Sequence, residues 1–353
     1  MTRALDETDR KLLNLIQAEF PLEERPFSAI GRTFELSEAD VTARIAALQT
    51  NPKVIRQISA IFDSKSLGYQ GMLVAAQVGE PSIDDAAAVI NAHPGVSHNY
   101  RRNHAYNLWY TLAVPPGSRL GLAGTVHVLH RLSGALVTRP MPTLKMYKIG
   151  VRLNLSDDAD PVAQLKATQS TSHDEHLPQL TERDKRIIRA LQQDLPLVER
   201  PFDVLAKEAG ITVPELLAAA KSYEETGRMR RFAAVLRHRE AGFKANAMGA
   251  WIVPVEKEDE FGAAAAKFPA VSHCYRRPTY EDWPYSLFTM VHGQTEDECE
   301  RVLKAISDAT GVTGYAALYS TKEYKKIRVR YFTGEIEAWE QRFAAPLREP
   351  ALA

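Results

Sequence analysis

The sequence predicts an α+β protein in which one architecture occurs twice along the chain, as a tandem duplication. Two repeated motifs predict the duplication. Glu24–Phe27 (ERPF) returns 175 positions later as Glu199–Phe202. His98–Arg102 (HNYRR) returns at the same offset of 175 as His273–Arg277 (HCYRR). A third observation sets the class, because helical periodicity at the start of each copy gives way to alternating strands.

The two copies also agree near their ends. Thr143, Lys145, Tyr147 and Lys148 match Ser320, Lys322, Tyr324 and Lys325 at an offset of 177. Three blocks in the same order are not explained by chance. The chain therefore reads as two copies of one unit, fused head to tail.

Each copy begins with three predicted helices. In copy one, Leu12, Leu13 and Ile16 follow helical spacing, residues 28–34 form a short second helix, and Ser37 caps a third that ends at Thr50. A strand over 55–62 follows. Three helices and a strand are the outline of a winged helix-turn-helix, which we assign to residues 1–63 and 180–238.

The second part of each copy reads βαββαβ, over residues 64–155 and 239–332. This order predicts a ferredoxin-like antiparallel sheet with both helices on one face. The equivalent sheet of the other copy is the natural cover for the second face, so the halves should pair as an internal pseudo-dimer; a further homodimer stays open. In copy one we expect strands at 72–78, 96–102, 106–114 and 144–151, with helices at 83–92 and 120–132.

Two segments fall outside the repeat. Residues 156–179 are rich in Asp, Ser, Thr and Gln and are predicted to be a solvated linker. A tail, 333–353, has no counterpart in copy one and is expected to form a helix around 336–343.

Composition excludes several classes of protein. Apolar residues make up 45% and charged residues 25%, an ordinary globular balance. Only two cysteines occur, Cys274 and Cys299, too few for a disulfide framework. There is neither an apolar leader nor a run of about 18 apolar residues. We expect a cytoplasmic protein without a membrane partner.

Charge argues against DNA as a partner. Lys and Arg total 44 and Asp and Glu total 44, so the formal net charge is zero. The third helix of copy one carries Arg44 against Glu38 and Asp40. Its counterpart, 214–225, carries one lysine against three glutamates. Recognition helices need cations for phosphate, so no specific DNA binding is expected.

The repeated His-x-Tyr-Arg-Arg motif is the strongest candidate for a site. In a strand, His98, Tyr100 and Arg102 share one face and Arg101 lies on the other. Aromatics and exposed arginines also suit an ordinary strand. The whole cluster occurring in both copies favours function instead. Flat rings and arginine forks suit a large, flat, polyanionic ligand.

Other chemistry lacks a motif. The sequence contains neither a G-x-x-x-x-G-K-[ST] phosphate loop nor a G-x-S-x-G elbow. His173 and His176 lie in the expected linker, so no metal site is predicted.

The first part of copy one resembles the Lrp/AsnC regulators, which join a winged helix to a βαββαβ ligand domain. The resemblance lies in LDETDRKLLNLIQ (5–17) and IRQISAIFD (55–63). A narrower branch, the siroheme decarboxylases, is resembled by three further segments. They are the PLxERPF run, HNYRRNHAYNLWY (98–110) and HCYRRPTYEDWPYSLFTMVHG (273–293). That resemblance implies a carboxy-lyase that removes CO2 from the acetate side chains at C12 and C18 of siroheme. The product, 12,18-didecarboxysiroheme, feeds haem or haem d1 synthesis. No cofactor is implied, since siroheme carries its own iron.

The resemblance and the chemistry together assign roles. Histidine suits proton delivery near neutral pH. The alternatives are an Lrp/AsnC-type transcriptional regulator and a haem-binding sensor. The expected catalytic residues are His98, His273, Arg101, His104 and Arg276. The expected substrate-binding residues are Tyr100, Arg102, Tyr106, Asn107, Trp109, Lys145, Tyr275, Arg277, Trp283, Tyr285 and Lys322.

Overall fold

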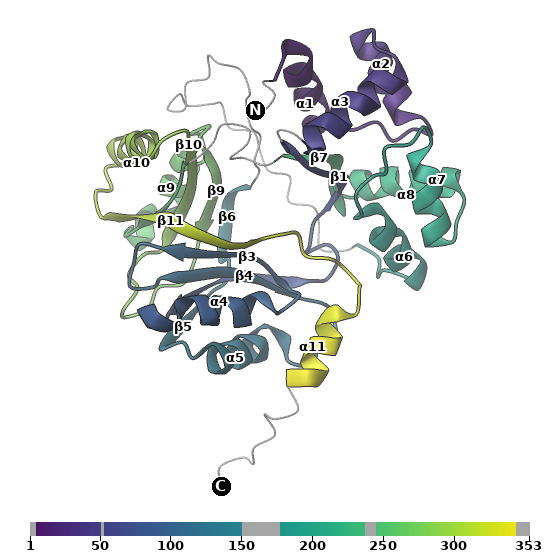
Figure 1. The fold of residues 1–353 in the computed structure, drawn as a ribbon. Coiled ribbons are helices and arrows are strands. Elements are labelled where there is room, and N and C mark those ends of the chain that lie inside the picture. Colours follow the sequence, from purple (N-terminus) through teal and green to yellow (C-terminus); the bar gives the residue numbers. More distant parts are fainter. Residues whose placement is uncertain (1–4, 51–52, 150–176, 237–244, 344–353) are drawn as a thin grey trace. The chain divides into compact units, whose positions relative to one another are not determined.

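The computed structural model describes residues 5–50, 53–149, 177–236 and 245–343 (Figure 1). The chain forms two compact units. The first unit holds the three-helix parts of both copies, and the second holds both sheets. The expected linker, 156–179, lies outside the described residues apart from its last three positions. Within the described part of the chain, no helix is long and apolar enough to cross a membrane.

The first unit contains the predicted helices of each copy followed by one strand. Asp6 and Thr181 cap the first helix of their copies, and each accepts a hydrogen bond from the backbone N–H three residues on. The strand of copy one pairs antiparallel with that of copy two. The elements are α1 (Glu7–Ala18), α2 (Pro26–Phe34), α3 (Glu38–Thr50), β1 (Ile55–Phe62), α6 (Glu182–Leu191), α7 (Pro201–Ala209), α8 (Val213–Glu225) and β7 (Met229–Leu236).

The ERPF motif joins the two copies within this unit. Its proline is the first residue of α2 and of α7, a position where the missing N–H costs nothing. Its arginines reach across, because Arg25 lies 3.4 Å from Glu199 and Arg200 lies 2.6 Å from Glu24. The motif therefore makes reciprocal contacts between the two copies.

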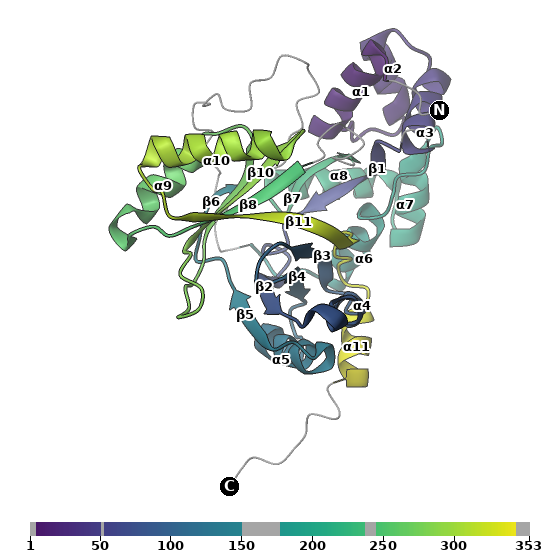
Figure 2. The same cartoon turned by 60° about the vertical axis from the view of Figure 1, so that its left-hand side comes forward.

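The second unit holds two sheets, one mainly from each copy, which β11 joins into a continuous order of nine strands, with helices beside them (Figure 2). Its strand order is β5-β2-β4-β3-β11-β8-β10-β9-β6. Copy one supplies β2 (Gln70–Gln77), η1 (Glu80–Ser82), α4 (Ile83–Asn91), β3 (Val96–Arg102), β4 (Leu108–Val114), α5 (Gly121–Ser133), β5 (Val137–Met141) and β6 (Lys145–Ile149). Copy two supplies β8 (Ala245–Trp251), η2 (Val255–Lys257), α9 (Glu258–Ala265), β9 (Val271–Arg276), β10 (Leu287–Gly293), α10 (Glu296–Thr310) and β11 (Tyr315–Lys326). The predicted α+β class and the duplication are confirmed.

The closing strands differ from the prediction. We expected residues 144–151 to close the sheet of copy one, with Lys145 and Lys322 each on its own copy's sheet. Instead β5 closes that sheet beside β2, and β6 crosses to pair with β9 of copy two. Reciprocally, β11 pairs with β8 through its first half and with β3 through its second half. Periodicity missed β5 because it is a short, half-buried edge strand containing Pro140, which edges tolerate.

The exchanged strands are held by a symmetric set of contacts. Lys145 Nζ lies 2.7 Å and Tyr147 Oη 2.5 Å from Oδ1 of Asp259. Lys322 Nζ lies 2.9 Å from Asp84, to which Tyr324 also donates a hydrogen bond. The repeated Lys-x-Tyr is therefore a contact between copies. The expected pairing of the two copies is present, through exchanged strands.

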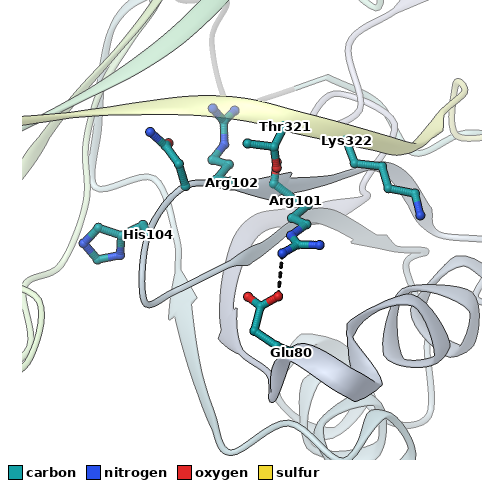
Figure 3. A pocket seen from close by; sticks show the side chains of 7 residues that line it. Glu80, Arg101, Arg102, His104, Thr321 and Lys322 are labelled. Atoms are coloured by element: carbon teal, nitrogen blue, oxygen red, sulfur yellow. Dashed lines mark hydrogen bonds and ion pairs between the residues drawn. The ribbon is translucent and has the colours of Figure 1, made fainter.

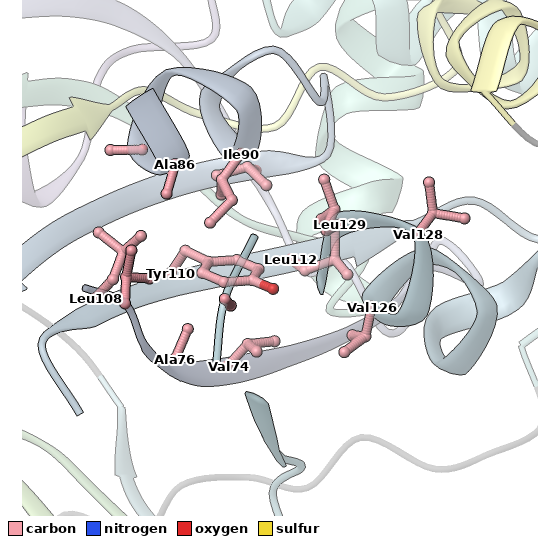
Figure 4. Packing of buried hydrophobic residues seen from close by; sticks show 14 of the residues in the cluster. Val74, Ala76, Ala86, Ile90, Leu108, Tyr110, Leu112, Val126, Val128 and Leu129 are labelled. Carbon is pink, nitrogen blue, oxygen red and sulfur yellow. The ribbon is translucent and has the colours of Figure 1, made fainter. Parts of the chain in front are cut away.

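Three hydrophobic clusters fill the second unit. Under the helices of copy one, Val74, Tyr110 and Leu129 belong to a cluster shown in Figure 4, and copy two has its own equivalent cluster. A third cluster lies on the opposite faces of the sheets and combines Trp109 of copy one with Phe288 of copy two. Each sheet therefore covers the helix-free face of the other, as predicted.

The tail forms helix α11 (Glu335–Phe343), which confirms the predicted helix. The ring of Trp339 packs edge-on against His93 at a centroid distance of 4.3 Å. Glu340 is 1% exposed, and its carboxylate accepts hydrogen bonds from the Arg119 N–H (3.0 Å) and the Ser118 hydroxyl. These contacts lie just before α5, where a negative charge stabilises a helix N-terminus.

A Trp339→Ala substitution should therefore destabilise the second unit. Removing a buried indole leaves a cavity, and the expected loss is about 3–5 kcal/mol in the free energy of unfolding. Hydrogen exchange of the α4 and α5 amides measures it. Glu337→Ala, at an exposed position of the same helix, is the matched control. Equal exchange rates in the two variants would contradict the contribution of α11.

Candidate active site

The two repeated motifs lie on β3 and on β9 and alternate as expected. Asn99 donates to the side chain of Asn91 in α4, and Arg101 pairs with Glu80 before that helix. Arg102, on the opposite face, donates to the carbonyl of Leu318. In copy two, Arg276 pairs with Glu258 at 2.9 Å on the helix face. The strands thus separate the two arginines of each motif onto opposite faces.

A register shift interrupts both strands at the histidine. Val96 pairs with Leu112 and His98 with Thr111, so Ser97 is the extra residue of a β-bulge. In copy two, Val271 pairs with Val291 and His273 with Met290, and Ser272 is the extra residue. Bulges re-aim side chains and are frequent beside active sites. Both histidines therefore occupy the same special backbone position.

The bulge brings each histidine against the preceding serine. Ser97 Oγ lies 3.0 Å from Nδ1 of His98, and Ser272 Oγ lies 2.7 Å from Nδ1 of His273. The second partner of the serine differs between the copies. It is the Thr111 hydroxyl at 2.6 Å in copy one and Nε2 of His292 at 2.9 Å in copy two.

These serines were not predicted as site residues. A signal existed, because Val-Ser-His occurs at both 96–98 and 271–273. Regular alternation places adjacent residues on opposite faces of a strand. The contact between the serine and the adjacent histidine, which the bulge creates, therefore could not be predicted from the sequence pattern.

A tyrosine and an arginine continue the row from each histidine. The rings of His98 and Tyr100 are 6.2 Å apart, and the guanidinium of Arg102 lies 5.9 Å from the Tyr100 ring centre. In copy two, the rings of His273 and Tyr275 are 5.9 Å apart. Arg277 lies 4.9 Å from the Tyr275 ring centre. Each copy thus presents imidazole, phenol and guanidinium in line.

Arg102 and Arg277 are buried cations, 4% and 8% exposed. Desolvation lowers the pKa of each to about 10, so both remain charged near neutral pH. Arg102 donates to the carbonyl of Leu318 at 2.6 Å, and Arg277 donates to that of Met141. Among the described residues, neither guanidinium has an ion pair with a carboxylate, and the Nε atom of each is buried without a hydrogen-bond partner. Burial of an unpaired charge is costly, so an anion would stabilise either site.

Four predicted site residues lie instead on the helix faces. Arg101 pairs with Glu80 and Arg276 with Glu258, while Lys145 and Lys322 contact Asp259 and Asp84. The structure therefore does not gather all the predicted cations around the histidines.

A cavity of about 470 Å³ lies at the end of β3, beside the exchanged β11 (Figure 3). Four predicted residues meet there, whereas His98 and Tyr100 are not among its lining. Burial lowers the pKa of His104, whose Nδ1 accepts the N–H of Tyr106 at 3.1 Å. The lining residues are Glu80, Arg101, Arg102, Asn103, His104, Thr321 and Lys322.

The predicted aromatic residues lie mainly in the core between the sheets. Tyr106, Trp109 and Trp283 are 3%, 2% and 0% exposed, and half-buried Tyr285 packs on Trp283 at 4.8 Å. Asn107 bonds the backbone N–H and carbonyl of Val78. Among the described residues, no group of three or more His, Cys, Asp or Glu could hold a metal ion.

Comparisons with known proteins agree with this architecture. The model of the AsnC-like ligand binding domain matches residues 66–148 and 240–325. The model of the siroheme decarboxylase NirDL-like HTH domain matches residues 9–56 and 184–230. A siroheme decarboxylase of Hydrogenobacter thermophilus is 40% identical over 93% of this chain and 96% of its own length. This chain belongs to the siroheme decarboxylase family.

A solved structure and a half-length relative extend the comparison. The crystal structure of the siroheme decarboxylase NirDL has a TM-score of 0.73 and 35% identity, and covers 97% of this chain and 99% of that chain. A siroheme decarboxylase beta subunit of Methanosarcina barkeri is 44% identical over 42% of this chain and 97% of its own length. Subunits of about half the length therefore occur in the siroheme decarboxylase family, in agreement with the predicted resemblance and the internal repeat.

Proposed function

We propose that this siroheme decarboxylase removes carbon dioxide from the acetate groups at C12 and C18 of siroheme, with His98 and His273 as proton donors. One observation carries the proposal. In both copies the histidine lies next to a β-bulge, and its Nδ1 is hydrogen-bonded to the hydroxyl of the preceding serine. A tyrosine and an arginine follow it on the same face of the strand. A solved relative at 34% identity is a co-complex with an iron-uroporphyrin III analogue, a related flat polyanion.

The chemistry needs an acid and an electron sink. Breaking the bond between the acetate CH2 carbon and its carboxylate releases CO2 and leaves the electron pair on that carbon. The conjugated macrocycle of the substrate takes up this density. A proton delivered to the carbon then completes a methyl group. Since the serine hydroxyl is hydrogen-bonded to Nδ1 of each histidine, we propose that the proton is delivered from Nε2.

Carboxylate binding follows from the unpaired buried cations. Arg102 lines the cavity and stays charged, and Arg277 occupies the same position in copy two. A siroheme carboxylate at either arginine would offset the cost of burying its charge. Tyr100 and Tyr275 offer ring faces beside them. Arg101, His104 and Lys322 complete the polar wall of the cavity of copy one.

Anaerobic incubation with siroheme followed by mass analysis of the tetrapyrrole tests the activity. Product lighter by two carbon dioxide molecules supports it. Bound but unchanged siroheme would support the haem-binding sensor instead.

The serines should act as positioning residues. We expect Ser97→Ala to lower kcat about 10-fold for the decarboxylation that depends on His98, and Ser272→Ala to do the same for the one that depends on His273. KM should change little, since in each case the imidazole loses one hydrogen bond to a neutral hydroxyl. Threonine, which keeps the hydroxyl, should restore most of the rate at each site. Alanine variants with unchanged kcat would show that the serine does not orient the ring.

We also propose that the winged helices do not bind DNA specifically. Arg44, the cation of α3, is bound by Asp6 and Asp9 at 2.8 Å each. A cation neutralised within its own domain contributes little to phosphate binding. Gel-shift titration of the intact protein with promoter-like DNA should therefore show no sequence preference at physiological salt. Nanomolar, sequence-dependent binding would favour the regulator.

A further inference from the structure

The loop between β9 and β10 differs from its counterpart in copy one. Nine residues, 278–286, join Arg277 to Leu287, whereas five, 103–107, join Arg102 to Leu108. The longer loop is a small hairpin in which Tyr280 and Trp283 exchange backbone hydrogen bonds of 2.8 and 2.9 Å. The extra residues of copy two thus have a defined structure.

The hairpin contacts copy one through an ion pair. Asp282 accepts hydrogen bonds from Arg139 at 2.9 and 3.1 Å and from the Tyr106 hydroxyl at 2.6 Å. The Arg139 guanidinium lies 5.0 Å from the Tyr280 ring centre, and the Tyr280 hydroxyl donates to the carbonyl of Pro140. We call Tyr106, Arg139, Tyr280, Asp282 and Trp283 the pairing cluster.

Trp283 lies between equivalent residues of the two copies. Trp109 pairs with Tyr100 and Phe288 with Tyr275, so Trp109 and Phe288 hold the same position in their sheets. The Trp283 ring centre is 5.2 Å from that of Trp109 and 6.1 Å from that of Phe288. A ring that touches both members of an equivalent pair lies close to the local symmetry axis. If two second halves paired, both copies of Trp283 would approach this one position.

Each copy supplies only one side of the pairing cluster. Arg139 pairs with Ala75 in β2, and Ala316 pairs with the equivalent Ala250 in β8. Copy two therefore has alanine where copy one has the guanidinium. Copy one in turn lacks the residues that carry Asp282 and Trp283.

Two other sets of contacts between the copies are reciprocal. Lys145 binds Asp259 as Lys322 binds Asp84, and Arg102 binds the Leu318 carbonyl as Arg277 binds that of Met141. Two copies of the same half could form such contacts equally well. Specificity is a difference between affinities, so these contacts do not select a partner.

We propose that the pairing cluster makes copy one selective for copy two within the sheet unit. Two copies of half one would leave Arg139 without its carboxylate and the Trp283 space empty, and the empty space is the more costly of the two because Arg139 is partly exposed. Two copies of half two would force two indoles into one space and place Asp282 opposite alanine. The matching partner for the copy-one surface is a sheet whose β9–β10 hairpin carries this Asp-Trp pair.

Re-pairing of cleaved chains tests the proposal. A protease site is inserted between residues 156 and 176 of the full chain, and the cut protein is incubated until its halves exchange. Native mass spectrometry then counts mixed and like pairs. Mixed pairs should exceed the random expectation by about 10²-fold, the scale of a filled cavity with a smaller contribution from the partly exposed Arg139–Asp282 ion pair.

Three variants decide the role of the cluster. Arg139→Asp and Asp282→Arg should each reduce the preference at least tenfold, and the double variant R139D/D282R should recover most of it. Lys145→Ala is the matched control, because it breaks a reciprocal contact and should leave the ratio unchanged. Random pairing of the parent chain, or equal preference in the single and double variants, would overturn the proposal. If a single variant does not fold, the double variant against the parent decides.

Discussion

Decarboxylation is expected to slow by about 10²-fold or more when either His98 or His273 is replaced by alanine, the usual scale for loss of a general acid. Each variant retains the other copy's histidine, so at least one should accumulate singly decarboxylated product. The copies should respond unequally because Ser97 is backed by Thr111 and Ser272 by His292. Single-turnover kinetics with mass analysis of each product measures both effects.

Binding should survive in both histidine variants, since Tyr100, Arg102 and their counterparts remain. The absorption spectrum of bound siroheme reports this directly. His127→Ala, an exposed histidine on α5, is the matched control and should retain the parent rate. If both variants match that control, the histidines are structural and the proton has another source.

Siroheme binding should weaken when Arg102 is replaced by alanine. A charge-assisted hydrogen bond to a carboxylate contributes about 1.5–3 kcal/mol, so Kd should rise about 10- to 100-fold. Arg102→Lys keeps the charge without the fork and should fall between parent and alanine. Spectroscopic titration under anaerobic conditions gives Kd for each protein.

The same arginine holds the Leu318 carbonyl, so unfolding must be measured beside binding. Arg131→Ala, at an exposed position, controls for the loss of a cation. A variant with lower stability and unchanged Kd would show that Arg102 only holds the exchanged strand.

Much of the fold could be predicted because the signals are local. Asp6 and Thr181 cap helices with their own side chains, and the alternation of His98 to Arg102 follows from the strand period. Because the motifs recur, the elements predicted for one copy could be assigned to the other as well. The tail helix was visible from its own residues.

The strand exchange was not predictable in the same way. The side chains of Lys145 and Tyr147 suit either sheet, and local pattern does not record which sheet a strand joins. The prediction that Lys145 and Lys322 lie on the last strands of their own copies' sheets was wrong for that reason. The serine contacts were hidden because a bulge breaks the period from which faces are read.

The most direct test of the account is the mass of the tetrapyrrole after anaerobic incubation with the parent chain and with the double variant His98→Ala, His273→Ala. The parent should convert siroheme to the product that has lost two carbon dioxide molecules, while the double variant binds siroheme and releases it unchanged. Full conversion by the double variant at the parent rate would contradict the assignment of the reaction to the two histidines.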